Sequence, residues 1–460
     1  MENKVDPIDL RLNISYRQIM LLALPISLSI FIPQFNFFTN NFFLGNYDKS
    51  GELLAAGGIT GVYYLIFAVM GYGLNNGLQA LISRRAGENR PEEISKLFWN
   101  GVRVALVISL IGIVLSYTVG SFMLHYSLKS SELADKAVTF LRIRVLGLPM
   151  LMLFQLCNVL LIATNNSRYL IIATLAETFA NIFFDYVLIY GHWGFPEYGF
   201  NGAAYASLIT EGVAFGVSVA VLYASGIVKR LQLDENTGFN KGIARLISVQ
   251  SLPLILQLVI SIMSWEFFFI LVERHGQILR GDNLESAITN VMRNFFGFFG
   301  CTTWALASTC NTMVSNVIGQ SLQDRVMKVI RMIMAMSVGF ALIFAVFINL
   351  FPEMLLNIYG QSAEFIKEGV PIVRIVSGAI IAMSLGAVAL NGVNGTAQSR
   401  ATLSIEIVAI FIYCAYVWLV YEHWRMPFFV GWLCEFLYWS SILGMAYFYL
   451  QSGRWKGKVI

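Results

Sequence analysis

The sequence predicts an all-α polytopic membrane protein, with twelve transmembrane helices arranged as two pseudo-symmetric lobes of six helices each. Hydrophobic side chains make up 57% of the 460 residues and charged side chains only 13%. A water-soluble chain of this composition would lack the polar surface needed to cover itself. The apolar residues also gather into uncharged segments that are long enough to cross about 30 Å of hydrocarbon as helix. Together with an internal repeat, these observations indicate that the chain is folded in lipid.

The expected spans follow one another along the whole chain. They are residues 18–43, 55–82, 99–124, 138–164, 169–190, 203–226, 247–272, 286–318, 329–350, 368–393, 401–421 and 428–450. The first segment is too long for a signal peptide and is not followed by a small-residue cleavage site, so we expect it to be retained as a span. Pro25 and Pro33 in the first span and Pro149 in the fourth predict kinks, because proline removes a backbone hydrogen bond from the helix.

Several landmarks recur 232 residues further along the chain. Ser83 and Gly87 recur as Ser315 and Gly319, Arg142 as Arg374, and the pair Ser167 and Arg168 as Ser399 and Arg400. Each copy holds an even number of spans, so both copies enter the membrane in the same orientation. We therefore expect an N-terminal lobe at residues 1–228, a polar cytoplasmic linker at 229–241 and a C-terminal lobe at 242–460. Such a repeat is typical of transporters that alternate the access to a site between two lobes.

Basic residues concentrate in alternate loops between the expected spans. They are Arg84, Arg85, Arg90, Lys96, Arg168, Lys229, Arg230, Lys241, Arg245, Arg325, Lys328, Arg331, Arg400, Arg454, Lys456 and Lys458. Cytoplasmic loops carry an excess of Lys and Arg, so we expect a multi-pass protein of the cell (inner) membrane with both termini in the cytoplasm. This bias accounts for the net charge of +4 without a nucleic-acid partner.

Cysteine and histidine give no sign of a metal centre or of an enzyme. The cysteines, Cys157, Cys301, Cys310, Cys414 and Cys434, all fall within expected spans and are interpreted as packing residues. The histidines, His125, His192, His275 and His423, fall near span ends, where we expect them to be solvated. The aspartate-rich magnesium motif and the phosphate loop of an intramembrane transferase are missing. We expect a monomer without enzymatic activity and without a cofactor.

Three stretches of the sequence resemble one family of transporters. The segments Gly77–Glu93 and Thr312–Asp324 are similar to the ends of the second helix of each lobe in the multidrug and toxic compound extrusion family, the MATE transporters. Asn181-Ile-Phe-Phe-Asp185, followed by Tyr198–Ser207, resembles the fifth and sixth helices of that family. The resemblance implies an antiporter that expels amphipathic, often cationic compounds while admitting protons or sodium ions.

Asp185 is the first candidate for the ion-coupling acid. A carboxylate within a membrane helix is costly unless it is paired, protonated or hydrated, so such residues are functional candidates. Asn181 lies one turn earlier on the same helix face. With the hydroxyl of Ser207 and the amide of Asn40, this group can hold a proton or coordinate Na⁺ at Asp185. In the competing interpretation, Asp185 lies near the outer interface and is simply hydrated.

The sequence departs from the family pattern at several positions. Asn40, five residues before Gly45, stands where many relatives carry an aspartate, and Ser207 replaces the usual threonine. Ser261 and Met383 stand where sodium-coupled bacterial relatives carry acids. Several carboxylates that the resemblance implies are therefore absent from this chain.

Glu266 is the second candidate acid, because its surroundings resemble the end of the Glu-Trp-Trp-x-x-Glu pattern of eukaryotic family members. A cleft between the lobes would be lined by aromatic and sparse polar groups. Its candidate residues are Phe35, Asn36, Phe37, Asn75, Asn76 and Trp265. Other intramembrane glutamates are expected to have structural roles, with arginine partners for some of them. These glutamates are Glu177, Glu211, Glu406 and Glu435, and the arginines are Arg142, Arg144 and Arg374.

The same arginines keep one alternative function open. A flippase for lipid-linked saccharides of the same broad superfamily would hold an anionic pyrophosphate with arginines that face its cleft. We prefer the antiporter, and an assay of lipid flipping set against dye efflux separates the two.

Overall fold

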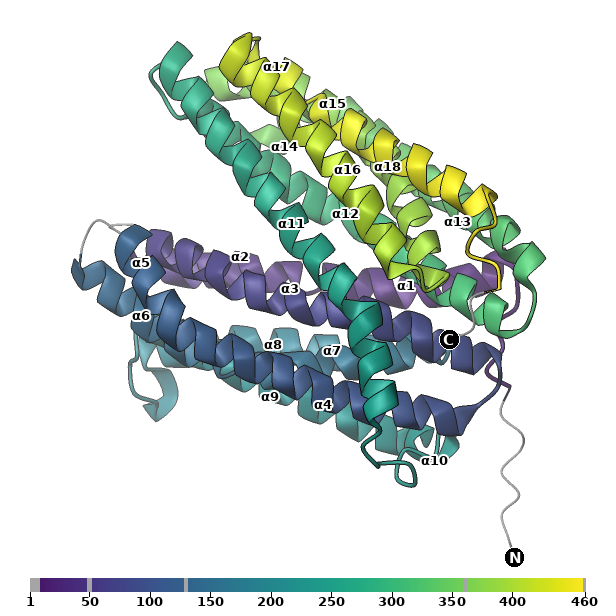
Figure 1. The fold of residues 1–460 in the computed structure, drawn as a ribbon. Helices are drawn as coiled ribbons and strands as arrows, with labels where there is room; N and C mark the ends of the chain where they lie inside the picture. The colour runs from purple at the N-terminus through teal and green to yellow at the C-terminus, as the bar shows by residue number, and fades with distance from the viewer. Residues whose placement is uncertain (1–8, 48–51, 128–130, 360–361, 458–460) are drawn as a thin grey trace, which may run out of the picture. The chain divides into compact units, whose positions relative to one another are not determined.

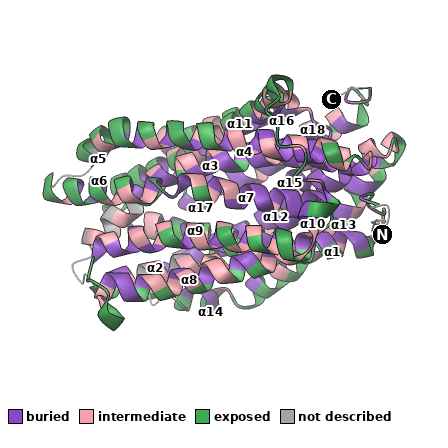
Figure 2. Cartoon of the chain, turned by 90° about the horizontal axis from the view of Figure 1, so that it is seen from below, coloured by how far each residue is buried: buried purple, intermediate pink, exposed green. Residues whose placement is uncertain are grey.

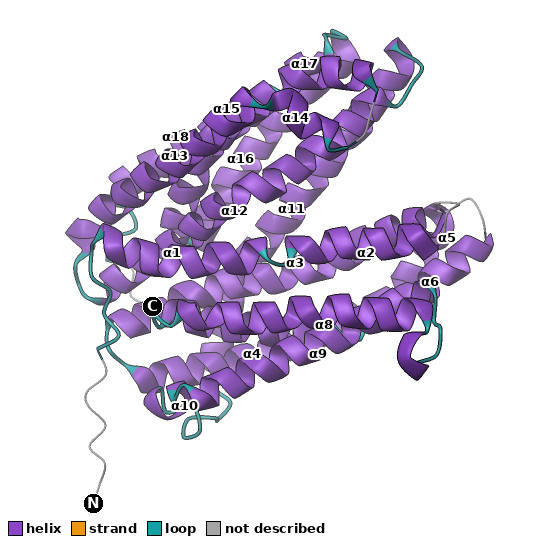
Figure 3. Ribbon diagram, turned by 180° about the vertical axis from the view of Figure 1, so that it is seen from behind, coloured by secondary structure: helices purple, strands orange, loops and turns teal. Residues whose placement is uncertain are grey.

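The computed structural model describes residues 9–47, 52–127, 131–359 and 362–457. Within these ranges the chain forms helices joined by loops and turns, without a strand (Figure 3). The predicted all-α class is therefore confirmed. The side chain of Phe37, one of the predicted cleft residues, lies outside the described residues.

All twelve predicted spans fall on helices (Figure 1). The first six correspond to α1 (Tyr16–Phe31) with α2 (Gln34–Tyr47), α3 (Glu52–Gly87), α4 (Pro91–Leu115) with α5 (Ser121–Ser127), α6 (Ser131–Val145) with α7 (Leu148–Ala163), α8 (Leu170–Tyr190) and α9 (Phe200–Ala224). The second six correspond to α11 (Lys241–Leu279), α12 (Leu284–Gly319), α13 (Val326–Leu350), α15 (Ala363–Gly395), α16 (Ser399–Trp418), and α17 (Phe428–Gly431) with α18 (Cys434–Gln451). Short helices α10 (Ile227–Arg230) and α14 (Pro352–Asn357) lie between them.

Length and composition qualify 10 of the described helical segments to cross a membrane, and the bent pair of α6 and α7 is an eleventh. The remaining predicted span lies on α12, which has 36 residues but carries more polar side chains. An α-helix rises about 1.5 Å per residue, so α12 is also long enough to cross the hydrocarbon layer. The count agrees with a polytopic helical membrane protein.

Two of the three predicted proline kinks are visible as breaks. The first span is divided between α1 and α2 at Pro33, and the fourth bends by 43° between α6 and α7, just before Pro149. Pro25 lies within the uninterrupted helix α1. The breaks occur where the missing N–H group and the ring of proline prevent a regular helix from continuing.

The contacts of the chain group it into two compact units. One comprises the residues up to Arg11 with Leu28–Ile255, and the other comprises Leu12–Ser27 with Leu256–Ile460. The beginning of α1 thus packs within the second unit, where Ile19 and Leu22 are buried in its core. The beginning of α11 packs within the first unit. The boundaries between the compact units therefore lie inside α1 and α11. The lobes at residues 1–228 and 242–460, which were inferred from the sequence repeat, stay a prediction.

On several helices one face is buried and the other is exposed (Figure 2). On α4, for example, Val107, Leu110 and Val114 are exposed, whereas Ala105 and Ser109 are buried. Large apolar side chains on the outside of a helix are typical of contact with lipid rather than with water. The exposed apolar face of α4 is therefore consistent with the membrane location.

Gly73 allows α3 and α11 to approach closely within the first unit. A Cβ atom at this position would lie 2.6 Å from the Cα atom of Ile255. One turn earlier on α11, the Ser251 hydroxyl donates a hydrogen bond to the carbonyl oxygen of Leu74 at 3.1 Å. The small residue at position 73 thus permits a close backbone approach, since any larger side chain must separate the two helices.

We expect Gly73→Val to destabilise the first unit by about 1–3 kcal/mol, the usual cost of overpacking. The measurement is the thermal unfolding midpoint of the purified protein in detergent. Gly61→Val is the matched control, because Gly61 lies on the same helix and a Cβ atom there meets nothing within 4 Å. Equal midpoints for the two variants would contradict the close packing.

Candidate ion-coupling site

Asp185 lies on α8 and is completely buried, with 0% of its surface exposed. Helix α8 is apolar along most of its length, ends at Tyr190 and is capped by Gly191 in the left-handed conformation at φ 71°. Because the side chain is buried, the interpretation of Asp185 as a simply hydrated interfacial residue is not supported. A buried carboxylate needs compensating partners, and its surroundings therefore define the candidate site.

The amide group of Asn40 provides the main contact of Asp185. With its nitrogen facing the surrounding oxygen atoms, Asn40 donates to Oδ2 of Asp185, to Oδ1 of Asn181 at 3.0 Å and to the carbonyl oxygen of Asn36 at 3.1 Å. Three of the four predicted ion-site residues, Asp185, Asn181 and Asn40, thus come together. The contact to Asn36 was not predicted, since it uses the backbone.

Aromatic packing between α2 and α8 holds this cluster together. The Tyr190 hydroxyl donates to the carbonyl oxygen of Phe43 at 2.8 Å. The ring of Phe43 packs against Tyr186 with centroids 6.2 Å apart. Phe43 lies within one turn of Asn40 on α2, and Tyr186 and Tyr190 lie within about one and a half turns of Asp185 on α8. The two helices are therefore fixed next to each other at the height of the carboxylate.

One oxygen atom of the carboxylate has no hydrogen-bond partner within the described part of the chain. Oδ1 of Asp185 is buried and receives no hydrogen bond from the described residues. Leaving a buried acceptor unpaired is costly, whereas a bound proton or cation would satisfy it. Sodium prefers such oxygen donors, so the carboxylate and amide oxygens here fit either ion. The described residues contain no group of three or more His, Cys, Asp or Glu side chains that could hold a metal ion.

Ser207 is not joined to this cluster. It is partly exposed on α9 and makes no hydrogen bond to Asp185, Asn181 or Asn40 within the part of the chain that the structure describes. Its predicted contribution as an ion ligand stays a prediction.

A second polar cluster is buried in the same unit. Arg144 of α6 pairs with Oε1 of Glu211 on α9 at 2.6 Å, and the hydroxyl of Tyr64 on α3 donates to the same oxygen at 2.7 Å. The guanidinium group also lies 3.8 Å from the centre of the Tyr64 ring. This pair confirms the expectation that an intramembrane glutamate has an arginine partner.

The positive charge of Arg144 also acts on acidic side chains other than Glu211. It interacts electrostatically with Asp185 and with Glu177. Oε2 of Glu211 is buried and has no hydrogen-bond partner among the described residues. A buried ion pair in the same unit contributes to the electrostatic field at the Asp185 carboxylate. The sequence contained a signal for Arg144 and Glu211, both charged and within spans, but none for Tyr64.

The predicted cleft residues have different surroundings. Phe35 is 49% exposed. Asn75 is buried and donates to Oε1 of Gln155 at 3.1 Å, a contact between α3 and α7 inside the first unit. Asn36 and Asn76 are partly buried in the same unit. Their role as a substrate cleft stays a prediction.

Trp265 and Glu266 belong to the second unit. The Trp265 ring packs edge to face on Phe296, with centroids 6.0 Å apart, and Glu266 is exposed on α11. Glu266 is thus not enclosed by partners in the way that Asp185 is. Two other intramembrane glutamates of this unit differ from Glu266, because Glu406 accepts a hydrogen bond from Tyr438 and Glu435 is buried.

The expectation of solvated histidines was wrong for His275. This residue is 3% exposed and contacts Glu285 through Nδ1 at 2.7 Å and the carbonyl oxygen of Met426 through Nε2 at 2.9 Å. His275 is buried because the loop after α16, which contains Met426, covers the end of α11. The hydrogen bond with Glu285 offsets the cost of burying the polar imidazole ring.

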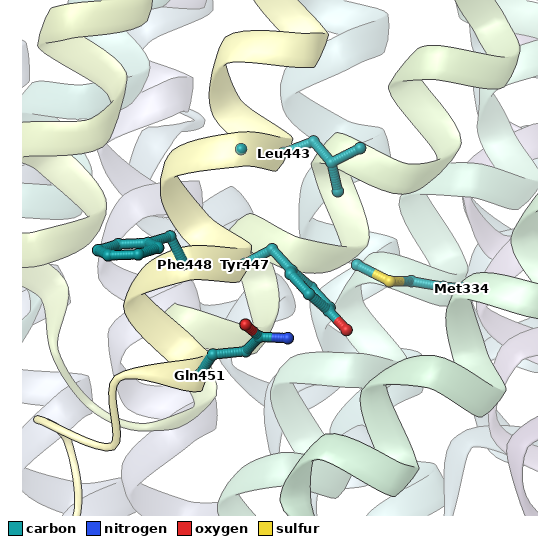
Figure 4. Close-up of a pocket in the computed structure, with 6 residues that line it drawn as sticks. Met334, Leu443, Tyr447, Phe448 and Gln451 are labelled. Atoms are coloured by element: carbon teal, nitrogen blue, oxygen red, sulfur yellow. The ribbon is translucent and has the colours of Figure 1, made fainter.

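A groove of about 450 Å³ lies between α13 and α18 in the second unit. The ring of Tyr447 points toward Met334 across it (Figure 4). Its other lining residues are Leu443, Gly444, Phe448 and Gln451. This groove contains no acidic side chain and is therefore not a candidate for cation coupling.

Comparison with known proteins agrees with the fold and with the repeat. The sequence model of the MatE family matches residues 25–187 and again residues 253–419. "Probable multidrug resistance protein NorM" of Thermotoga maritima is 22% identical over 430 residues, which cover 91% of this chain and 88% of that protein. The protein with the same description from Listeria monocytogenes serovar 1/2a is 28% identical over 197 residues, which cover 42% of this chain and 43% of that protein.

Solved structures have the same fold. A structure described as an outward-facing conformation of a multidrug resistance MATE family transporter of the MOP superfamily has a TM-score of 0.85 at 14% identity, covering 96% of each chain. A MOP superfamily transporter from Pyrococcus furiosus has a TM-score of 0.84 at 15% identity, covering 97% of this chain and 96% of that one.

The fold and the repeated helices define a multi-pass helical membrane transporter. Since the family model matches most of both halves, the chain belongs to the MatE family.

Proposed function

We propose that this protein is a cation-coupled antiporter that exports amphipathic, often cationic compounds by alternating access between its two lobes, with a proton or Na⁺ as the coupling ion. The observation that supports this proposal most directly is the buried Asp185 carboxylate, which is held by Asn40 and has one oxygen atom without a partner among the described residues. A carboxylate in this position gains stability when a monovalent cation neutralises it.

The amide of Asn40 suits both states of such a site. Facing Asp185 with its nitrogen, it donates to the ionised carboxylate. Rotated by half a turn, the amide presents its oxygen to a bound sodium ion or to the hydrogen of a protonated carboxyl group. With asparagine instead of aspartate at position 40, the cluster carries one negative charge. We therefore expect one monovalent cation per transport cycle at this site.

The relatives support the substrate class, since several proteins that match carry the description "Probable multidrug resistance protein NorM". Aromatic side chains can bind cationic compounds with about 0.5–2 kcal/mol per contact. We further propose a location in the cell (inner) membrane with both termini in the cytoplasm, on the basis of the Lys and Arg distribution.

The saccharide flippase is less well supported. Arg144, one of the arginines that a pyrophosphate would require, is paired with Glu211, and a buried arginine that already has a carboxylate partner gains little from a second anion. The family match also favours export of small molecules.

The decisive experiment is transport of a cationic dye by the purified protein in proteoliposomes. Proton and sodium gradients are imposed separately, each with the other ion at equilibrium. We expect dye movement with one of the two gradients and none when that gradient is collapsed. Dye movement that is independent of both gradients, or flipping of a lipid-linked saccharide without dye transport, would refute the proposal.

A further inference from the structure

A groove of about 400 Å³ crosses the first unit between α3, α4 and the beginning of α11. Its walls are apolar, with Val107 and Ile108 on α4 and Leu252 and Ile255 on α11. Val107 is 58% exposed and Leu252 is 57% exposed. The groove is thus open to the surroundings of the helices and does not contribute to the Asp185 cluster.

One end of the groove is positively charged. Arg103 lines it and donates to two backbone carbonyl oxygens, that of Trp99 at 3.1 Å and that of Thr237. These contacts orient the guanidinium group but leave its charge uncompensated, because carbonyl oxygens are neutral. No carboxylate within the described residues forms an ion pair with Arg103.

Further cations lie at the same end of α11. Lys241 and Arg245 occupy its first turns, are exposed and have no ion-pair partner in the described part of the chain. The acidic residues of the preceding linker, Asp234 and Glu235, are also exposed and are not paired with them. The charged end of the groove therefore carries a basic surface that can attract an anion.

The charged end of the groove coincides with the expected edge of the membrane. The predicted spans begin at residues 99 and 247, so Arg103 lies about one helical turn inside the edge. Val107 lies one turn beyond Arg103, and Ile255 two turns beyond the start of its span. An arginine near a helix end can extend its head group to the membrane interface. From the interface inward, the groove thus offers first a cation and then an apolar trough.

The internal repeat has no arginine at the corresponding position of its second copy. The residue 232 positions after Arg103 is Ala335 on α13, which is exposed. The corresponding helix of the second unit thus packs without a cation at this position. A charged side chain that is placed in one copy only, near the hydrocarbon and without a carboxylate partner, requires another explanation.

We propose that this groove binds one anionic phospholipid of the predicted cytoplasmic leaflet. Its phosphate lies against Arg103, and one acyl chain follows Val107 and Leu252 toward the membrane centre. Arginine is well suited to this contact, because its planar guanidinium group binds phosphate with paired hydrogen bonds. The apolar walls match an acyl chain in chemistry, and the basic end matches an anionic head group in charge.

The test is native mass spectrometry of the full-length protein in detergent, titrated with phosphatidylglycerol or phosphatidylcholine of identical acyl chains. We expect one tightly bound phosphatidylglycerol, preferred over phosphatidylcholine. A cation at the membrane surface contributes about 1 kcal/mol to such binding, so Arg103→Gln should weaken phosphatidylglycerol binding by about fivefold. Binding of phosphatidylcholine should remain unchanged.

Two further variants separate the groove from general attraction by surface charge. Val107→Trp fills the apolar trough and leaves every charge in place, so we expect it to weaken the binding of both lipids. Arg17→Gln removes an exposed arginine of the second unit and should leave both affinities unchanged. Equal binding of the two lipids by the unmodified protein would overturn the proposal. So would an equal loss in Arg103→Gln and Arg17→Gln, or full binding in Val107→Trp.

Discussion

Asp185→Asn should abolish ion-coupled export while the protein remains folded in the membrane. The two side chains have nearly the same shape, and the neutral amide avoids the cost of burying a charge. What is lost is the negative charge that a proton or Na⁺ must neutralise. We expect dye transport in proteoliposomes to fall to the level of empty liposomes under either gradient. The variant should still be purified as a folded protein with an unchanged unfolding midpoint or a higher one.

Asp135→Asn is the matched control for this experiment. Asp135 is an acid of the same unit whose side chain is 71% exposed, so we expect full transport by this variant. If Asp185→Asn transports as well as the control does, the coupling acid lies elsewhere, and Glu266 becomes the next candidate. A loss of transport in both variants would indicate a general effect of removing acidic charge.

Arg144→Gln should have the second-largest effect, this time on stability. The substitution leaves Glu211 as a buried acid without its cation, and breaking a buried pair in this way costs about 3–5 kcal/mol. We expect a clear drop in the thermal unfolding midpoint in detergent. Arg142→Gln is the control, since Arg142 lies two residues away on the same helix but is exposed, where it donates to the Ser121 hydroxyl and lies over the ring of Tyr117.

A double variant tests whether the cost arises from the unpaired acid. Arg144→Gln combined with Glu211→Gln removes both charges, so it should be more stable than Arg144→Gln alone. An Arg144→Gln midpoint equal to that of Arg142→Gln would show that the ion pair contributes little. If the double variant is the least stable of all, the polar contacts rather than the charges hold these helices together.

The sequence predicted those features that depend only on residues close together along the chain. The length and apolarity of each segment determine whether it can cross a bilayer, and all twelve predicted spans lie on helices. The breaks at Pro33 and before Pro149 follow from the missing N–H group of proline. Asn181 and Asp185 share a helix face because residues four apart in a helix always do.

Other features depended on contacts between distant segments. The meeting of Asn40 with Asp185 requires α2 to pack against α8, and the contact of Tyr64 with Glu211 joins residues 147 positions apart. The burial of His275 depends on a loop about 150 residues further along the chain. One sequence indicates which residues are costly to bury, because that cost belongs to the residue itself. Only the tertiary structure decides which side chain becomes the partner that offsets this cost. The chain contains many polar side chains that could form such a contact, and the packing of the helices brings one of them into reach.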